Sequence, residues 1–246
     1  GEPTVFVHGN PTNPADWIPF LERLERPGIA YDVPGWGRSD SPGDFDYYVL
    51  ALSWSATWCA LEGDVRDDPQ CDPGRGLTFV LHGFWPQDED GWPSYCRAAE
   101  RDPTRGQTAA MADIMGGSGP AFYQWKKHGR CSGLTAADYF STARQAHASV
   151  TIPDLFQQVD RSLTLPASVI EEAFLEANPD LRPDHIAITC KDGLIQEARI
   201  CLTRDLAPRR RYRPRRRVPR AVEVEDRRRA QRRLPELRAG VVGVVD

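Results

Sequence analysis

The chain has 246 residues, with 31 Lys and Arg against 35 Asp and Glu and a formal net charge of -4. That average hides a division, because residues 209–246 hold 14 Arg and five acidic residues (+9), whereas residues 1–208 hold 17 basic and 30 acidic residues (-13). No stretch approaches the roughly 20 apolar residues that a membrane-spanning helix needs, so we expect no membrane insertion. The length suits one domain of ordinary size with extensions.

The first 43 residues have a pattern of their own. An apolar strand is predicted at 4–7, an H-G turn follows at 8–9, a helix is predicted through 17–24, and P-G-W-G-R-S-D stands at 34–40. This order resembles the start of an α/β-hydrolase, a family whose His-Gly loop supplies N–H groups to an oxyanion hole. The nucleophile elbow G-x-S-x-G should follow. The nearest string, G-G-S-G-P at 116–120, lacks the last Gly and follows no predicted strand, so we expect a truncated fragment that is not an independent domain.

A different pattern occupies residues 44–208. Aromatic and β-branched residues predict strands at 47–53 and 77–82, with Gly-, Pro- and Asp-rich turns between them. Helical periodicity then predicts helices at 107–115, 121–128, 135–149, 153–161 and 166–177. Thr135 is expected as the N-cap of the third, and Pro166 opens the last.

Two further strands are predicted at 185–191 and 195–202, on either side of Asp192-Gly193, a hairpin turn signal. Strands, then helices, then strands, without regular β-α-β alternation, argue for an α+β fold with a mainly antiparallel sheet and several helices packed on it.

The last region, 209–246, contains arginine runs that cannot bury apolar surface and repel one another. We expect it to be disordered or a marginal helix. A nucleic-acid-binding tail is one interpretation, and it is disfavoured because an out-of-frame translation of a GC-rich coding sequence produces the same pattern and would also account for the hydrolase-like start.

Six cysteines form an even set without a zinc-like C-x-x-C pair: Cys59, Cys71, Cys96, Cys131, Cys190 and Cys201. Disulfides are the favoured interpretation, which predicts a secreted or periplasmic protein. Buried thiols are the alternative.

Two short strings carry candidate chemistry. F-V-L-H-G-F-W-P at 79–86 places His82 at the end of an apolar strand. The second string, W-K-K-H-G-R-C-S-G at 125–133, contains Lys127 and His128. With Gln124 they stand at i, i+3 and i+4, on one face of a predicted helix. A face with an amide, a cation and an imidazole suits an anionic substrate. Two imidazoles can act as general acid and general base near neutral pH.

These strings resemble the two active-site segments of the ribonuclease T2 family, H-G-L-W-P and H-E-W-x-K-H-G-T-C. The resemblance extends over about 44–208 and includes S-W-S-A-T-W-C at 53–59, W-P-S-Y-C at 92–96 and I-T-C-K at 188–191.

The resemblance implies a monomeric endoribonuclease that cleaves single-stranded RNA without a metal or cofactor. His128 would take the ribose 2′-OH proton as general base, and His82 would protonate the departing 5′-oxygen as general acid, leaving a 2′,3′-cyclic phosphate. Lys127 would stabilise charge on the phosphate oxygens. DNA lacks the 2′-OH and should not react.

Trp85 matches the base-stacking aromatic of the family, and Trp92 is a looser candidate for the same pocket. Two positions depart from the usual pattern: Tyr123 stands where the family often has a phosphate-binding His, and Gln124 where it often has Glu. We expect activity with weaker phosphate binding, and the alternative is a catalytically impaired RNA-binding relative. An α/β-hydrolase is disfavoured by the missing elbow.

The resemblance also implies disulfide pairs. The expected bonds are Cys59–Cys71 and Cys96–Cys131, whereas Cys190 and Cys201 either bond each other across the hairpin or stay free.

Overall fold

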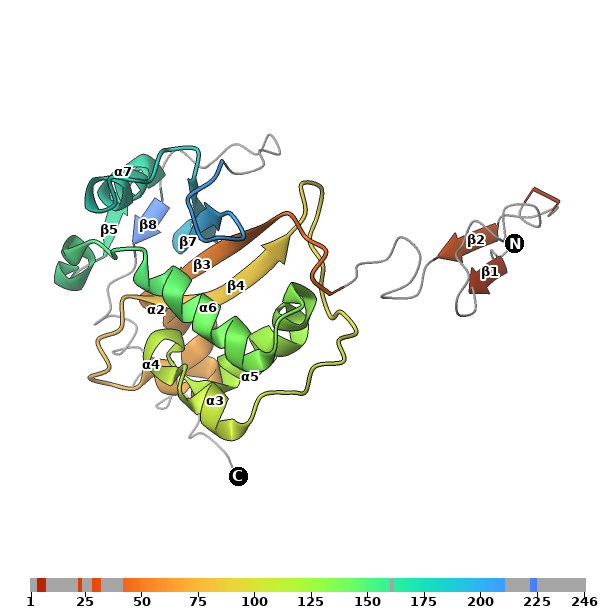
Figure 1. The fold of residues 1–246 in the computed structure, drawn as a ribbon. Helices are drawn as coiled ribbons and strands as arrows, with labels where there is room; N and C mark the ends of the chain where they lie inside the picture. Colours follow the sequence, from red (N-terminus) through yellow and green to blue (C-terminus); the bar gives the residue numbers. More distant parts are fainter. Residues whose placement is uncertain are drawn as a thin grey trace, which may run out of the picture.

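The computed structural model describes residues 4–7, 22–23, 28–31, 42–159, 162–210 and 222–224. Most of the described residues form an α+β body in which helices pack against a mainly antiparallel sheet (Figure 1). The predicted fold class is therefore confirmed.

The sheet has six strands in the order β4-β3-β7-β8-β5, and β6 pairs with β7 as well. The β3–β4, β3–β7, β6–β7 and β5–β8 pairs are antiparallel, and β8 meets β7 in parallel at one position. The strands are β3 (Tyr47–Trp54), β4 (Phe79–Gln87), β5 (Leu163–Leu165), β6 (Ile186–Lys191), β7 (Leu194–Leu202) and β8 (Val222–Val224).

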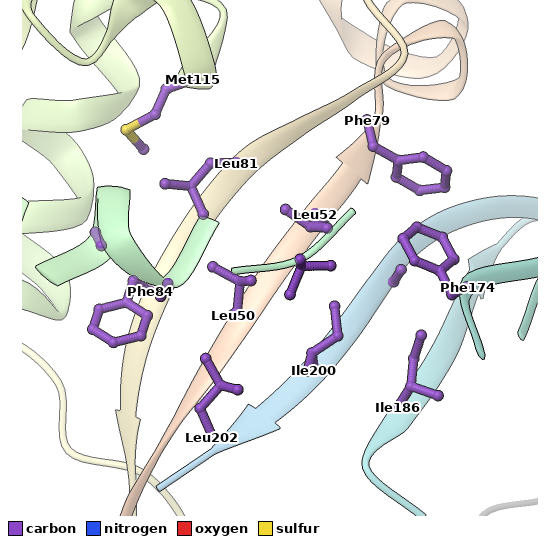
Figure 2. Packing of buried hydrophobic residues seen from close by; sticks show 14 of the residues in the cluster. Leu50, Leu52, Phe79, Leu81, Phe84, Met115, Phe174, Ile186, Ile200 and Leu202 are labelled. Atoms are coloured by element: carbon purple, nitrogen blue, oxygen red, sulfur yellow. The ribbon is translucent and has the colours of Figure 1, made fainter. Parts of the chain in front are cut away.

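Alternation along the strands gives the sheet two different faces. One face packs into the main core with the helices, and it carries Leu50 and Leu52 of β3, Leu81 and Phe84 of β4, and Ile200 and Leu202 of β7 (Figure 2). The other face carries the intervening residues of β3 and β7. It includes a small apolar cluster of Tyr47, Val49 and Cys201, with the half-buried Trp85 packed against it.

In the described part of the chain, one α-helix follows β3 directly, four lie between β4 and β5 in the sequence, and one lies between β5 and β6. In Figure 1, α4, α5 and α6 lie beside β3 and β4. The α-helices are α2 (Ser55–Trp58), α3 (Arg105–Ala109), α4 (Ala112–Met115), α5 (Ser118–Lys127), α6 (Ala136–Ala148) and α7 (Ala167–Ala177). A π-helical turn at Cys59–Gly63 and short 3-10 helices at Asp64–Arg66, Pro69–Cys71, Gly129–Ser132 and Asp154–Gln158 complete the set.

Helix prediction is accurate where a cap was recognised. Thr135 is the N-cap of α6 and accepts a hydrogen bond from the Asp138 N–H, and Pro166 occupies the N-cap position of α7. The helix predicted at 153–161 is wrong in type, since only a 3-10 turn forms and Val159 is already extended.

The helix predicted at 107–115 is also wrong, because it is divided into α3 and α4. A capping box of Thr104 and Gln107 starts the first piece earlier than predicted. The division lies at Ala110, whose carbonyl accepts a hydrogen bond from Arg144 of α6; the same guanidinium bonds Asp113 in the next piece. A tertiary contact thus takes up a carbonyl that a continuous helix would have used itself.

The β6–β7 hairpin forms where it was predicted. Its two central residues have positive φ, 53° at Asp192 and 82° at Gly193, as a tight turn that matches strand twist requires.

Two of the expected disulfides are present, Cys59–Cys71 and Cys96–Cys131. The bond suggested between Cys190 and Cys201 is not formed. Cys190 pairs with Ile195 in the hairpin, and Cys201 lies six residues farther along β7, roughly 20 Å away along the strand.

The two ends of the chain each contribute strands. β1 (Thr4–Val7), which was predicted, pairs in parallel with β2 (Gly28–Tyr31) in a separate two-stranded sheet. The helix predicted through 17–24 lies outside the described residues, apart from a turn at 22–23.

In the arginine-rich region, disorder was expected, but Val222–Val224 forms β8 against β5. β-branched valines favour extended backbone, which accounts for this exception. The other residues beyond 210 lie outside the described part. Within that part, no helix is both long and apolar enough to cross a membrane.

Candidate active site

His82 projects from an irregularity in the sheet. Along β3, Ala51 pairs with Gly83 and Leu52 with Leu81, so His82 is the extra residue of a β-bulge in β4. Bulges re-aim side chains and are frequent beside active sites. Here the neighbours in β4 are buried, while the His82 side chain is 43% exposed. The bulge therefore turns an imidazole out of an otherwise buried strand.

The Nδ1 atom of His82 hydrogen-bonds to Glu197 Oε1 on β7. The other oxygen of this carboxylate accepts a 2.6 Å bond from Arg199 Nε. Burial acts to raise the pKa of Glu197, but the bond from His82 and the charge of Arg199 outweigh it and hold that pKa below its ordinary value. Neither Glu197 nor Arg199 was predicted as a site residue, although two opposite charges inside an apolar strand were a signal.

His128 ends α5 and lies in a very different environment. It is only 5% exposed, and no described group bonds its Nδ1. Burial lowers the pKa of His128 to about 3, with Lys127 and His82 contributing in the same direction. The imidazole is therefore neutral at neutral pH.

Trp85 joins the two histidines. Its ring centroid lies 5.2 Å from that of His82 and 5.3 Å from that of His128. The indole Nε1 donates a 2.7 Å hydrogen bond to Gln124 Oε1 on α5, and Gln124 is buried. Gly83 permits this arrangement, since a Cβ at that position would collide with both the indole and the Gln124 amide.

Three basic residues near the C-terminal end of α5, Lys126, Lys127 and Arg130, have different partners. Lys126 and Arg130 both bond Asp102, at 3.1 and 2.8 Å, on one side of the helix. Lys127 instead places its Nζ 5.8 Å from the ring centroid of Tyr123. Of the three cations, Lys127 is therefore the one placed next to the other candidate residues.

Tyr123 is 50% exposed, and its hydroxyl lies 3.4 Å from that of Tyr95. Tyr95 has a φ of 54°, which is rare for a bulky residue, and its N–H donates to the Lys127 carbonyl. The neighbouring Cys96–Cys131 disulfide fastens this loop to the segment after His128.

A cavity of about 470 Å³ opens beside these groups. His82 and Glu197 line it from the sheet, and Tyr123 and Gln124 line it from α5. Trp92, the looser candidate, is 63% exposed, and the cavity walls are formed by other residues. The structure thus places three predicted site residues, His82, Gln124 and His128, against Trp85. Tyr123 lies on the cavity wall with Lys127 beside it, while Trp85, Lys127 and His128 are not among the residues that line this cavity.

Comparison with known proteins matches residues 45–209 to the model of the Ribonuclease T2 family. The chain belongs to this family. Both candidate histidines, Lys127 and Trp85 lie inside the matched range, as does Glu197. The range matched to the Ribonuclease T2 model, 45–209, differs by one residue at each end from the range of 44–208 expected from the sequence.

Individual relatives agree with this assignment. A ribonuclease of Aeromonas hydrophila is 44% identical over 130 residues, which cover 51% of this chain and 54% of the relative. The match thus spans about half the length of that protein. Among solved structures, trichomaglin, described as a novel S-like ribonuclease, gives a TM-score of 0.59 at 21% identity, covering 74% of this chain and all of that one.

A structure of RNase NT in complex with 5′-AMP gives a TM-score of 0.56 at 18% identity, covering 74% of this chain and 98% of that one. At such identities these two structures show that the fold is shared. The G-G-S-G-P string at 116–120 does not form the nucleophile elbow of a hydrolase, because Ser118 begins α5 just after α4 and follows a helix instead of a strand.

Proposed function

We propose that the protein is an endoribonuclease that cleaves single-stranded RNA by metal-free transphosphorylation and acts as a monomer. The observation that carries this proposal is the pairing of two unlike imidazoles around one indole: a neutral, buried His128 and an exposed His82 held by a carboxylate. General acid–base catalysis by two histidines needs one imidazole that can accept a proton and one that can donate a proton.

In this mechanism His128 accepts the proton of a ribose 2′-OH, and the resulting alkoxide attacks the adjacent phosphorus. The bond from phosphorus to the 5′-oxygen breaks, and His82 transfers a proton from Nε2 to the leaving oxygen, since its Nδ1 is engaged with Glu197. The products are a 2′,3′-cyclic phosphate and a free 5′-OH. Lys127 stabilises the negative charge that builds on the phosphate oxygens.

The Trp85 ring must move for this reaction. It contacts both imidazoles, where the scissile phosphate has to lie. A base that stacks on the indole would draw the ring outward and break its bond to Gln124. Hydration would then lessen the burial that lowers the His128 pKa and make this histidine a stronger base.

Three substrates test the activity: single-stranded RNA, single-stranded DNA and a carboxylic ester, each incubated with excess EDTA. We expect cleavage of the RNA alone, with 2′,3′-cyclic phosphate ends identified by mass spectrometry. Ester cleavage, or RNA cleavage that requires a divalent metal, would contradict the proposal.

A second candidate is an RNA-binding relative without cleavage. Tyr123 favours it, because a tyrosine hydroxyl supplies a hydrogen bond but no positive charge for a phosphate. Retained binding of RNA with no product in the same experiment would establish this candidate instead.

We also propose a secreted or periplasmic location. The two disulfides support it, since such bonds persist mainly in oxidising compartments. Fractionation of cells that express the native gene would test this.

A further inference from the structure

The site contains an ion pair, Glu197 with Arg199, that takes no part in the proton transfers of the proposed reaction. Glu197 is 1% exposed, and its two carboxylate oxygens have different partners, His82 on one side and Arg199 on the other. Burying a carboxylate is costly unless it is paired and hydrogen-bonded. An apolar side chain at this position would fill the sheet at a lower cost, so packing alone does not account for the pair.

The strand register explains how Glu197 reaches His82 from β7. β3 lies between β7 and β4, and it places Ser53 opposite Glu197 and Ala51 opposite Arg199. Ser53 and Ala51 are both small, which leaves room for the side chains of Glu197 and Arg199 to cross β3 toward β4. The bulge inserts His82 into β4 between Gly83, which pairs with Ala51, and Leu81, which pairs with Leu52. His82 is thereby within reach of the Glu197 carboxylate.

Arg199 continues the connection to the aromatic ring. Its guanidinium carbon lies 5.2 Å from the centroid of the Trp85 ring, a cation–π distance. The same guanidinium bonds Glu197 at 2.6 Å. One arginine thus contacts both the carboxylate that holds His82 and the indole that lies against it.

We propose that Glu197 and Arg199 are positioning residues that orient the general acid and tie its orientation to the position of Trp85. Glu197 keeps the Nδ1 side of His82 toward the sheet, so that Nε2 carries the transferable proton at the cavity. The carboxylate accepts the hydrogen bond from Nδ1 and takes no proton itself. Arg199 fixes Glu197 through its hydrogen bond and also contacts the indole of Trp85. The inference rests on the proposed function, in which His82 acts as the acid.

A comparison of two leaving groups tests the role of Glu197. A ribodinucleoside monophosphate expels an alkoxide that needs a proton, whereas a ribonucleoside 3′-(4-nitrophenyl phosphate) expels a phenolate that does not. Glu197→Gln should lower kcat on the dinucleotide by about 10- to 100-fold, part of what a positioned acid contributes. It should change kcat on the nitrophenyl ester less than about threefold, with KM nearly constant for both.

Asp113→Asn is the matched control, since Asp113 is a carboxylate paired with an arginine outside the site. It should leave both rates unchanged. Equal losses on both substrates in Glu197→Gln would assign Glu197 a merely structural role, and no loss on either would overturn the proposal.

Two further measurements separate this inference from the proposed function. His82→Ala should show the same leaving-group dependence; if it does not, His82 is not the acid. Independently of any activity, the ring nitrogen signals of His82 in long-range proton–nitrogen NMR spectra should place a proton on Nδ1 in the wild type and lose that preference in Glu197→Gln. An unchanged ring spectrum would overturn the role of Glu197 even if the chain cleaves no RNA.

The connection through Arg199 is tested by a double-mutant cycle with Trp85. Arg199→Met and Trp85→Phe should each lower kcat/KM on the dinucleotide, and the double variant should lose clearly less than the product of the two losses. Losses that multiply would show that the two residues act independently and would overturn the coupling.

Discussion

The strand-borne and helix-borne halves of the site hold their histidines by opposite means. His82 on β4 is exposed and is bonded to a buried carboxylate, whereas His128 at the end of α5 is buried and has no described partner for its Nδ1. Orientation is set by a charged partner in the first half, and protonation state is set by burial in the second. One protein can thus prepare two identical side chains for opposite roles.

The largest expected effect comes from removing either histidine. His82→Ala and His128→Ala should each reduce RNA cleavage on the order of 10³-fold, within the range for general acid and base groups. Rates of 2′,3′-cyclic phosphate formation measure this, with circular dichroism as the test of folding. His147→Ala on α6 is a matched control. Near wild-type activity in His82→Ala or His128→Ala would refute the catalytic role of the histidine that was replaced.

Acid should destabilise the protein through the buried histidine. An unfolded His128 binds a proton below about pH 6.5, but the folded one resists it down to about pH 3. Below pH 6.5 the unfolded state therefore binds more protons, and stability falls as the pH falls. Between pH 7 and 4 this single group should cost roughly 3 kcal/mol.

Urea denaturation at the two pH values measures that loss. His128→Asn should lose less stability between them than the wild type does, by about the same amount. Equal losses in the two proteins would show that His128 is not buried as a neutral group.

Gly83 lies beside a contact between the two halves of the site, the hydrogen bond from Trp85 of β4 to Gln124 of α5. Gly83→Ala would drive its Cβ into the Trp85 indole and the Gln124 amide, so the ring or the helix has to shift. We expect kcat/KM to fall by about tenfold, since small misplacements of catalytic groups are costly. Gly119→Ala, where an added Cβ meets nothing within 4 Å, is the control. Unchanged kinetics in Gly83→Ala would show that the Trp85 position is irrelevant to turnover.

The smallest expected effect concerns the helix-borne half alone. Tyr123→His adds an imidazole near Lys127, and its positive charge below about pH 6.5 should lower KM for RNA a few-fold. The gain should vanish at pH 8, and Tyr123→Phe should show no such pH dependence. A KM that is the same at both pH values in Tyr123→His would exclude a phosphate near this position.

The sequence was sufficient for the features that local chemistry determines. Thr135 has a capping side chain, and Asp192-Gly193 can adopt the positive φ that the hairpin needs. The start of α6 and the β6–β7 turn were therefore predictable from a few neighbouring residues. The division between α3 and α4 was not, because Arg144 lies 34 residues from the Ala110 carbonyl that it takes up.

The same limit applies to the site. His82, His128 and Lys127 are contained in two short strings, but Glu197 is 115 residues from its partner His82. Its signal was an acidic residue in an apolar strand, and only the strand order shows which histidine it faces. The bulge at His82 was equally hidden, since it depends on the register between β3 and β4.

The placement of Trp85 has a consequence for measured affinity. Because the indole rests against both imidazoles, only the fraction of molecules in which it has moved away can accept a phosphate there. The apparent dissociation constant is then the intrinsic constant divided by that fraction, so a fraction of ~0.1 weakens binding about tenfold. A substitution that frees the ring without displacing the catalytic groups would therefore tighten binding of RNA without touching it, unlike Gly83→Ala, whose methyl also presses on Gln124 of α5.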